Sequence, residues 1–379
     1  MVVVDLPPTV MTPSFSRPRE VWPFVSVILV VRNGAVHVSR QVAELMNLDY
    51  PQEAYEILVV DGLSTDGTGE RLRVVQEKYP GKIRLLRNPR QILSTGWNIG
   101  ISNAKGEIVL RVDVHAALER DYLQVCVRTL LALEDSGVPA AAVGGNVQMV
   151  AASIGTWPRA IAAAWNSGIG AARPAYRSSE KSGPSDSLAL AVFRKRVLDG
   201  VGRLDERLGR TEDNELFDRL RREGYVVYLT PDTSARYFVR TRLRDLFLQM
   251  FSNGSWLLPT LVLVRRNVFR LRHFVPGICL ALAVVLLIYG DALGIFVLLG
   301  LIATYLTGVA LAAVASGRNH GVGRVATASA ILCMHGAYAL GTWIGSLGVM
   351  LRVMRSLWGS QEGGATALEL GSRSEEHTP

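Results

Sequence analysis

Asp113, Val114 and His115 follow a short apolar run that predicts a buried strand. Alternate residues leaving a strand point to the same side, so the Asp113 carboxylate and the His115 imidazole can hold one divalent cation between them. Mg²⁺ or Mn²⁺ at this place would neutralise the charge that builds up on a leaving diphosphate. The alternative interpretation is a loop histidine whose hydrogen bonds are satisfied within the protein.

Glu212 and Asp213 form a second pair of acids, at the start of a polar helix predicted over about 212–223. A carboxylate at a helix N-terminus is stabilised by the helix dipole, so one interpretation is a simple cap together with Thr211. The other interpretation is a general base that removes a proton from an attacking hydroxyl group. The local sequence leaves both open.

The segment from Asp61 to Thr68 places two further carboxylates in a turn after a predicted strand. Asp61, at the strand tip, can accept hydrogen bonds from a base or a ribose. Asp66 can do the same, or it can cap the following helix with Gly67 and Thr68 as turn residues.

Gln249 and Trp256 lie on an amphipathic stretch near the apolar end of the chain. Tryptophan is common at the headgroup level of membranes, so Trp256 can be an interfacial anchor. Alternatively, Trp256 and Gln249 form the floor of an acceptor site.

Alternating strands and helices must position these residues. Short apolar runs indicate strands buried on both faces, and apolar residues at helical spacing indicate helices between them. Such alternation predicts a parallel sheet with right-handed crossovers and a ligand site beyond the carboxyl ends of its strands. The turns at Asn33, 61–66 and 113–115 all fall at that edge.

The predicted strands cover 25–31, 56–60, 83–86 and 107–112, and the predicted helices cover 36–46, about 67–79 and 94–103. From Val143 the pattern loosens into further strands and loops, with an Arg- and Ser-rich segment over 173–187.

The composition is that of a folded domain with an apolar tail. Of the 379 residues 49% are hydrophobic and 20% charged, which excludes a disordered, collagen-like or disulfide-scaffold protein. The net charge of +8 comes mainly from arginine. Because these arginines cluster beside apolar spans, we expect membrane lipids as partners and no nucleic acid. The three widely spaced cysteines predict buried thiols.

The apolar tail predicts a membrane region. We expect a flexible N-terminal segment over 1–23, a catalytic domain over 24–242, an amphipathic membrane-interface segment over 243–272, a transmembrane region over 273–355 and a disordered tail over 356–379. Spans over 274–290 and 292–316 are clear, with Asp291 facing outward, and 325–351 forms either a third span or a re-entrant hairpin. Because no signal peptide pattern opens the chain, we expect the catalytic domain to stay in the cytoplasm.

Taken together, the motifs resemble a known family. The run from Val25 to Asn33, the run from Glu56 to Thr68, Asn98-Ile99-Gly100-Ile101, Asp113-Val114-His115 and Glu212-Asp213-Asn214-Glu215-Leu216 look like an inverting family 2 glycosyltransferase. The Asp-x-His motif, the segments 171–177 and 202–206, and the trailing helices with Met334-His335 look like the succinoglycan glucosyltransferase type of exopolysaccharide enzyme. The resemblance covers roughly residues 24–351.

The resemblance implies the α/β GT-A fold, with a mostly parallel Rossmann-like sheet, followed by an amphipathic interface helix and C-terminal transmembrane helices. It implies Asp213 as the catalytic base, Asp113 and His115 as ligands of Mg²⁺ or Mn²⁺, and Asp61 at the nucleotide. The residues that we assign to the donor side are Val31, Arg32, Asn33, Asp61, Ser64, Asp66, Asn98, Arg111 and Asp113. The residues that we assign to the acceptor side are Asp186, Glu212, Gln249 and Trp256.

The expected activity is transfer of a sugar, glucose by preference, from a UDP-sugar to a polyprenyl-diphosphate-linked or other lipid-linked glycan at the cytoplasmic face of the inner membrane. This transfer would serve exopolysaccharide or cell-envelope glycan synthesis. Three positions depart from the family pattern: Gly34 stands where Glu is usual, Trp97 where a small or basic residue is common, and Ser252-Asn253 where Arg-Tyr is usual. Two alternatives follow. One is a synthase that charges polyprenyl phosphate itself, and the other is a membrane-anchored nucleotide-sugar-binding protein without turnover.

Overall fold

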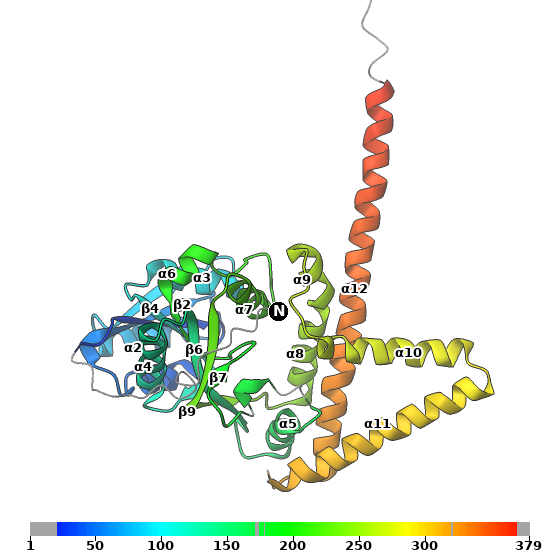
Figure 1. Ribbon diagram of the computed structural model, residues 1–379, viewed down its shortest axis with the longest axis horizontal. Coiled ribbons are helices and arrows are strands. Elements are labelled where there is room, and N and C mark those ends of the chain that lie inside the picture. Colours follow the sequence, from blue (N-terminus) through cyan, green and yellow to red (C-terminus); the bar gives the residue numbers. More distant parts are fainter. Residues whose placement is uncertain (1–20, 171–173, 178, 320, 370–379) are drawn as a thin grey trace, which may run out of the picture.

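The structure is a computed structural model that describes residues 21–170, 174–177, 179–319 and 321–369. An α/β domain precedes a set of long apolar helices (Figure 1). Most of the expected N-terminal segment and the last part of the expected disordered tail lie outside the described residues.

The N-terminal half of the domain confirms the predicted parallel sheet. Strands β1 (Val25–Val31), β2 (Tyr55–Asp61), β3 (Ile83–Arg87) and β4 (Ile108–Asp113) pair in parallel in the order β3-β2-β1-β4. Helices α1 (Val38–Leu45), α2 (Thr68–Lys78) and α3 (Leu93–Asn103) form the crossovers. A short 3₁₀ turn, η2 (Gln52–Ala54), leads into β2. The β-branched runs of the strands are buried on both faces, as helix-covered parallel strands must be.

The second half extends the same sheet with strands of both directions. Its strands are β5 (Ala116–Leu118), β6 (Ala140–Val150), β7 (Gly183–Pro184), β8 (Ala191–Arg194) and β9 (Val226–Phe238). The order continues β4-β8-β6-β9-β5, with β7 pairing with β9, and β8 runs antiparallel between β4 and β6. The helices of this half are α4 (Tyr122–Asp135), α5 (Thr156–Asn166), α6 (Lys195–Val201) and α7 (Glu212–Arg222), with the 3₁₀ turn η3 (Ala175–Arg177).

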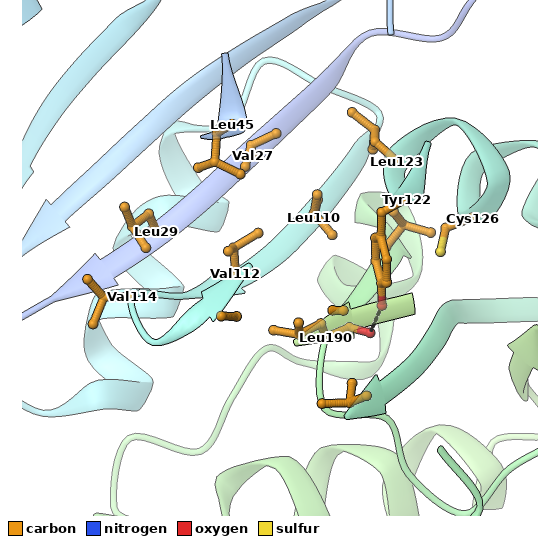
Figure 2. Packing of buried hydrophobic residues seen from close by; sticks show 14 of the residues in the cluster. Val27, Leu29, Leu45, Leu110, Val112, Val114, Tyr122, Leu123, Cys126 and Leu190 are labelled. Atoms are coloured by element: carbon orange, nitrogen blue, oxygen red, sulfur yellow. Dashed lines mark hydrogen bonds between the residues drawn. The ribbon is translucent and has the colours of Figure 1, made fainter. Parts of the chain in front are cut away.

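Tyr122 joins the two halves in the core. Its side chain is fully buried, and its hydroxyl donates to the carbonyl oxygen of Leu190 at 2.9 Å, just before β8. The Tyr122 hydroxyl oxygen also accepts the backbone N–H of Gly145 on β6 at 2.9 Å. Figure 2 shows this hydrogen bond beside the apolar side chains of β1 and β4. Because both hydrogen-bonding capacities of the buried hydroxyl are used, it fixes α4 against the antiparallel strands at little desolvation cost.

The C-terminal helices are α8 (Leu243–Ser255), α9 (Leu257–Val264), the 3₁₀ turn η4 (Leu271–His273), α10 (Val275–Tyr289), α11 (Ala292–Asn319) and α12 (Arg324–Glu369). In the described chain, three stretches are long and apolar enough to cross a membrane: Leu243–Val264, Ala292–Arg318 and Arg324–Arg355. Helix α10 is apolar but shorter. The α10–α11 hairpin extends away from the domain, and α12 runs crosswise to it beside α8 (Figure 1).

The structure favours one of two alternatives in this region and overturns one expectation. Helix α12 is continuous, which agrees with a third span over 325–351 and leaves no turn for a re-entrant hairpin. Residues 356–369, expected to be disordered, continue the same helix, since no proline interrupts it.

Two glycines of α12, Gly341 and Gly345, allow close packing of this helix on α8. A Cβ atom at Gly341 would lie 2.1 Å from the carbonyl oxygen of Phe251, and one at Gly345 would lie 2.1 Å from that of Ser255. From the other helix, a Cβ at Gly254 would lie 2.1 Å from the carbonyl oxygen of Tyr338. Small residues let helix backbones approach in this way.

Gly341→Ala is therefore expected to destabilise the protein, by about 1–3 kcal/mol as for other overpacked contacts. The contact is backbone, so no flexible side chain can yield. Gly348→Ala is the matched control on the same helix, because nothing lies within 4 Å of its added methyl group. Thermal unfolding in detergent measures both, and equal melting temperatures would contradict the packing role.

Candidate active site

The acid-bearing turns come together at the carboxyl edge of the sheet. Strand β1 lies between β2 and β4, and its register pairs Val31 with Asp61 on one side and Val30 with Asp113 on the other. Asp61 and Asp113 therefore end the two strands that flank β1, and their partners on β1 are one residue apart. Both lie at the carboxyl edge of the sheet, where the strand pattern predicts a ligand site.

The loops after β1 and β2 are bound to each other. The backbone N–H of Asn33 donates to Ser64 Oγ at 2.8 Å, and the Asn33 side-chain oxygen accepts the N–H of Thr65 at 2.9 Å. Ser64 Oγ in turn donates to Asp61. Asn33 has a left-handed φ of 52°, which asparagine tolerates better than most residues. Asn33, Asp61 and Ser64 are thus brought together, with Arg32 and the end of Val31 beside them.

Asp66 links the same two loops by its carboxylate. One oxygen accepts the N–H of Ala35 at 3.0 Å, and the other accepts the backbone N–H and hydroxyl of Thr68. The hydrogen bond from the Thr68 hydroxyl is the main cause that holds the pKa of Asp66 below its usual value. The backbone donors lower this pKa further. Gly67 is the N-cap residue of α2, and Asp66, one residue before it, binds the N–H of Thr68, the first residue of the helix. Asp66 thus supports the helix start without being its cap, and a donor contact of Asp66 stays a prediction.

Asp113 is the last residue of β4, and His115 follows it by two residues. Burial raises the pKa of Asp113 despite the opposing charge of Arg111. Burial, with Arg240 and His37 adding to it, lowers the pKa of His115 to about 4, so its ring is neutral at pH 7. The His37 ring lies edge-on to it with centroids 5.1 Å apart, and Arg240 Nη1 is 3.5 Å from His115 Nε2. A sequence-based analysis missed His37, because its only signal was a histidine in the loop after β1.

These two side chains fit a divalent cation shared with a ligand. One carboxylate and one neutral imidazole are donors that Mn²⁺ and Mg²⁺ accept. Within the described residues no cluster of three or more His, Cys, Asp or Glu side chains is placed to hold a metal. Oxygens of a bound diphosphate would therefore have to complete the coordination, as they commonly do for Mg²⁺.

Arg111 organises the acids around it. Its guanidinium lies 4.9 Å from the centroid of the buried Trp97 ring, and Arg111 Nη2 is 3.6 Å from Glu212 Oε1. Burial works against its charge, but Asp113, Glu212 and Asp213 outweigh burial and raise the pKa of Arg111. Trp97, a departure from the family pattern, is thus the platform on which this cation stacks.

Glu212 and Asp213 diverge at the start of α7. Glu212 is only 4% exposed and faces Arg111, and burial, then the Asp213 charge, raises its pKa to about 7. Asp213 is half-buried, with one oxygen accepting the N–H of Asn214 at 2.8 Å. Thr211 is the N-cap residue of α7 but makes no side-chain capping bond, so the helix start agrees only in part with the capping interpretation.

The remaining assigned residues lie in three different settings. Asn98 is tied to the loop before α7, exchanging hydrogen bonds with Leu204 and donating to Glu206 at 3.0 Å. Asp186 pairs with Arg270, in the segment after α9. Gln249 is half-buried on α8. Trp256 packs on Gly209, where an added Cβ would lie 2.6 Å from its ring, so it adjoins the loop that leads to Asp213.

Comparisons with known proteins bear on the family and the fold of the chain. The family model described as glycosyl transferase family 2 matches residues 26–200. The succinoglycan biosynthesis protein ExoA of Rhizobium meliloti is 28% identical over 328 residues, covering 84% of this chain and 93% of that protein. A dolichyl N-acetyl-α-D-glucosaminyl phosphate 3-β-D-2,3-diacetamido-2,3-dideoxy-β-D-glucuronosyltransferase of Methanococcus voltae is 24% identical over 74% of this chain and 86% of its own.

A solved structure supports the fold. The mannosyltransferase PcManGT of Pyrobaculum calidifontis, in complex with GDP-Man and Mn²⁺, matches with a TM-score of 0.53 and 19% identity, covering 85% of this chain and 90% of that one. Residues 26–200 thus match the family 2 glycosyltransferases, and the α/β domain has the GT-A fold.

Proposed function

We propose that this glycosyltransferase moves a sugar, glucose by preference, from a UDP-sugar to a lipid-linked glycan at the cytoplasmic membrane face, with inversion. The observation that carries the proposal is the position of Asp213. It stands at the start of α7 beside Arg111, in a loop that packs on the membrane-proximal helices. A base there is close both to the donor edge of the sheet and to a lipid acceptor. One relative is named as a succinoglycan biosynthesis protein, and the name of another contains a dolichyl-phosphate-linked sugar. Both names support a lipid-linked glycan as the acceptor.

The residues divide the reaction among them. Asp61 and the loop pair Asn33 and Ser64 would bind the nucleotide at the end of β2. Asp113 and His115 would hold a Mn²⁺ or Mg²⁺ ion, which when bound offsets the negative charge of the leaving diphosphate. Asp213 would take the proton of the acceptor hydroxyl during attack on the anomeric carbon from the face opposite the diphosphate. An α-linked donor then gives a β-linked product.

A donor and acceptor panel tests this proposal directly. Purified protein is incubated with UDP-glucose, other UDP-sugars and GDP-mannose, in turn with extracted glycolipid and with bare polyprenyl phosphate. The mass of the lipid product identifies both substrates. A hexose added to a lipid-linked glycan from UDP-glucose supports the proposal, whereas a sugar added only to bare polyprenyl phosphate favours the synthase alternative.

The proposed orientation predicts a labelling pattern in cells. With Cys126, Cys279 and Cys333 replaced, a cysteine at position 291 in the α10–α11 turn should react from outside with an impermeant thiol reagent. A cysteine at the exposed position 180, in the catalytic domain, should react only after lysis. The basic flank at 265–272 is the physical reason, since positive charge favours the cytoplasmic side. Labelling of a cysteine at position 180 but not at 291 in intact cells would show that the orientation is the opposite of the one proposed.

A further inference from the structure

The loop and helix that carry Asp213 contact residues 256–266, which include helix α9, at three points. Gly209 lies against the Trp256 ring, with no room for a Cβ. Thr211 Oγ1 is 2.7 Å from Thr260 Oγ1 on α9. Arg266, just after α9, pairs with Glu215 at 2.7 Å and with Asp218 at 3.4 Å, both on α7.

The threonine contact has a defined direction. The Thr211 hydroxyl donates to the neighbouring carbonyl of Arg210, so the hydrogen between the two threonines comes from Thr260. Thr260 is fully buried, and the bond therefore forms away from competing water.

Thr211 needs such support because of its backbone. Its φ of 65° is in the left-handed region, which a β-branched residue rarely adopts and keeps only where the surroundings hold it. The next two residues are Glu212 and Asp213. A change in the Thr211 backbone would therefore move the Asp213 carboxylate directly.

We propose that Thr260 is a positioning residue for Asp213, acting through Thr211, and that Arg266 holds the same helix one turn further along. The outer face of α9 carries the exposed side chains of Val262 and Leu263, which suit a lipid surface. The position of α9 in the membrane thereby determines the position of the Asp213 carboxylate. This inference rests on the proposed role of Asp213.

Thr260→Val keeps the shape of the side chain and removes the hydroxyl, and its test has two arms in lipid nanodiscs. The first is hydrogen exchange, in which peptides covering 209–216 should exchange faster while those of β1 to β4 stay unchanged. The second is steady-state kinetics, in which kcat for transfer should fall by about tenfold or more with the donor KM unchanged, since a displacement of about 1 Å can cost about 100-fold. Thr260→Ser should restore both.

Thr304→Val is the matched control, because Thr304 lies on α11 and bonds only the carbonyl of Gly300 within its own helix. Arg266→Gln is the second variant, since Glu215 keeps Arg219 as a partner when Arg266 is lost. This variant should also increase the rate of hydrogen exchange in the peptides covering 209–216.

Unchanged exchange over 209–216 in both variants would overturn the positioning role. So would a raised donor KM at unchanged kcat, or faster exchange throughout the domain, which would indicate a general packing defect. If Asp213→Asn retained transfer, the base assignment would fail, whereas the exchange arm would still decide whether α9 holds this helix.

Discussion

Asp213→Asn is expected to bind the UDP-sugar with unchanged affinity and to lose glycan transfer by at least about 100-fold. Asparagine keeps the shape and the hydrogen bond to the N–H of Asn214 but removes the basicity. An acceptor hydroxyl has a pKa far above neutrality, and general-base catalysis contributes about 10²- to 10⁴-fold. Any slow hydrolysis of the donor by water should survive.

The measurement combines donor affinity by calorimetry with transfer rates to extracted glycolipid. Asp49→Asn is the matched control, because Asp49 pairs with Arg120 at the surface, at 2.9 Å and 46% side-chain exposure. Unchanged transfer by Asp213→Asn would show that the carboxylate is not the base. It would also favour a phosphate acceptor, which is already an anion and needs no proton removed.

The parallel half of the fold was predictable because its signals are local. A run such as Val25–Val31 is apolar and β-branched over its whole length, and a strand buried on both faces requires that pattern. The rule that ligands bind at the carboxyl edge then brought Asp61 and Asp113 together without any structure. The same reasoning placed Glu212 and Asp213 at a helix start, which α7 confirms.

One element was missed despite a local signal: nothing was assigned to 122–135, although Leu123, Val127 and Leu130 have the spacing of the helix that α4 forms. The other features that escaped prediction depend on contacts between distant residues. The inward turn of Glu212 depends on Arg111, about a hundred residues earlier and on another element. Gly341 and Gly345 look like helix weaknesses until α8 is seen against them. None of these partners can be read from neighbouring sequence.

Asp113→Asn is expected to lose nearly all transfer, and removal of divalent cations by a chelator should do the same to the wild type. Asp113 and His115 are the donors placed at the end of β4, and burial keeps the His115 ring neutral by lowering its pKa to about 4. The leaving diphosphate carries charge that must be offset in the transition state, a contribution of several kcal/mol in metal-dependent enzymes. Added Mn²⁺ or Mg²⁺ should restore the wild type but not Asp113→Asn.

A binding measurement separates the metal role from folding. Mn²⁺ binding in the presence of UDP, followed by electron paramagnetic resonance, should weaken strongly in Asp113→Asn while the melting temperature stays near that of the wild type, because Arg111 keeps Glu212 as its partner. His115→Asp should retain part of the binding and of the activity, since it replaces the imidazole by a second carboxylate that Mn²⁺ accepts. Full transfer by Asp113→Asn in the presence of chelator would show that this pair of residues binds no catalytic metal, and the diphosphate charge would then have to be met by cationic side chains such as Arg111 and Arg240.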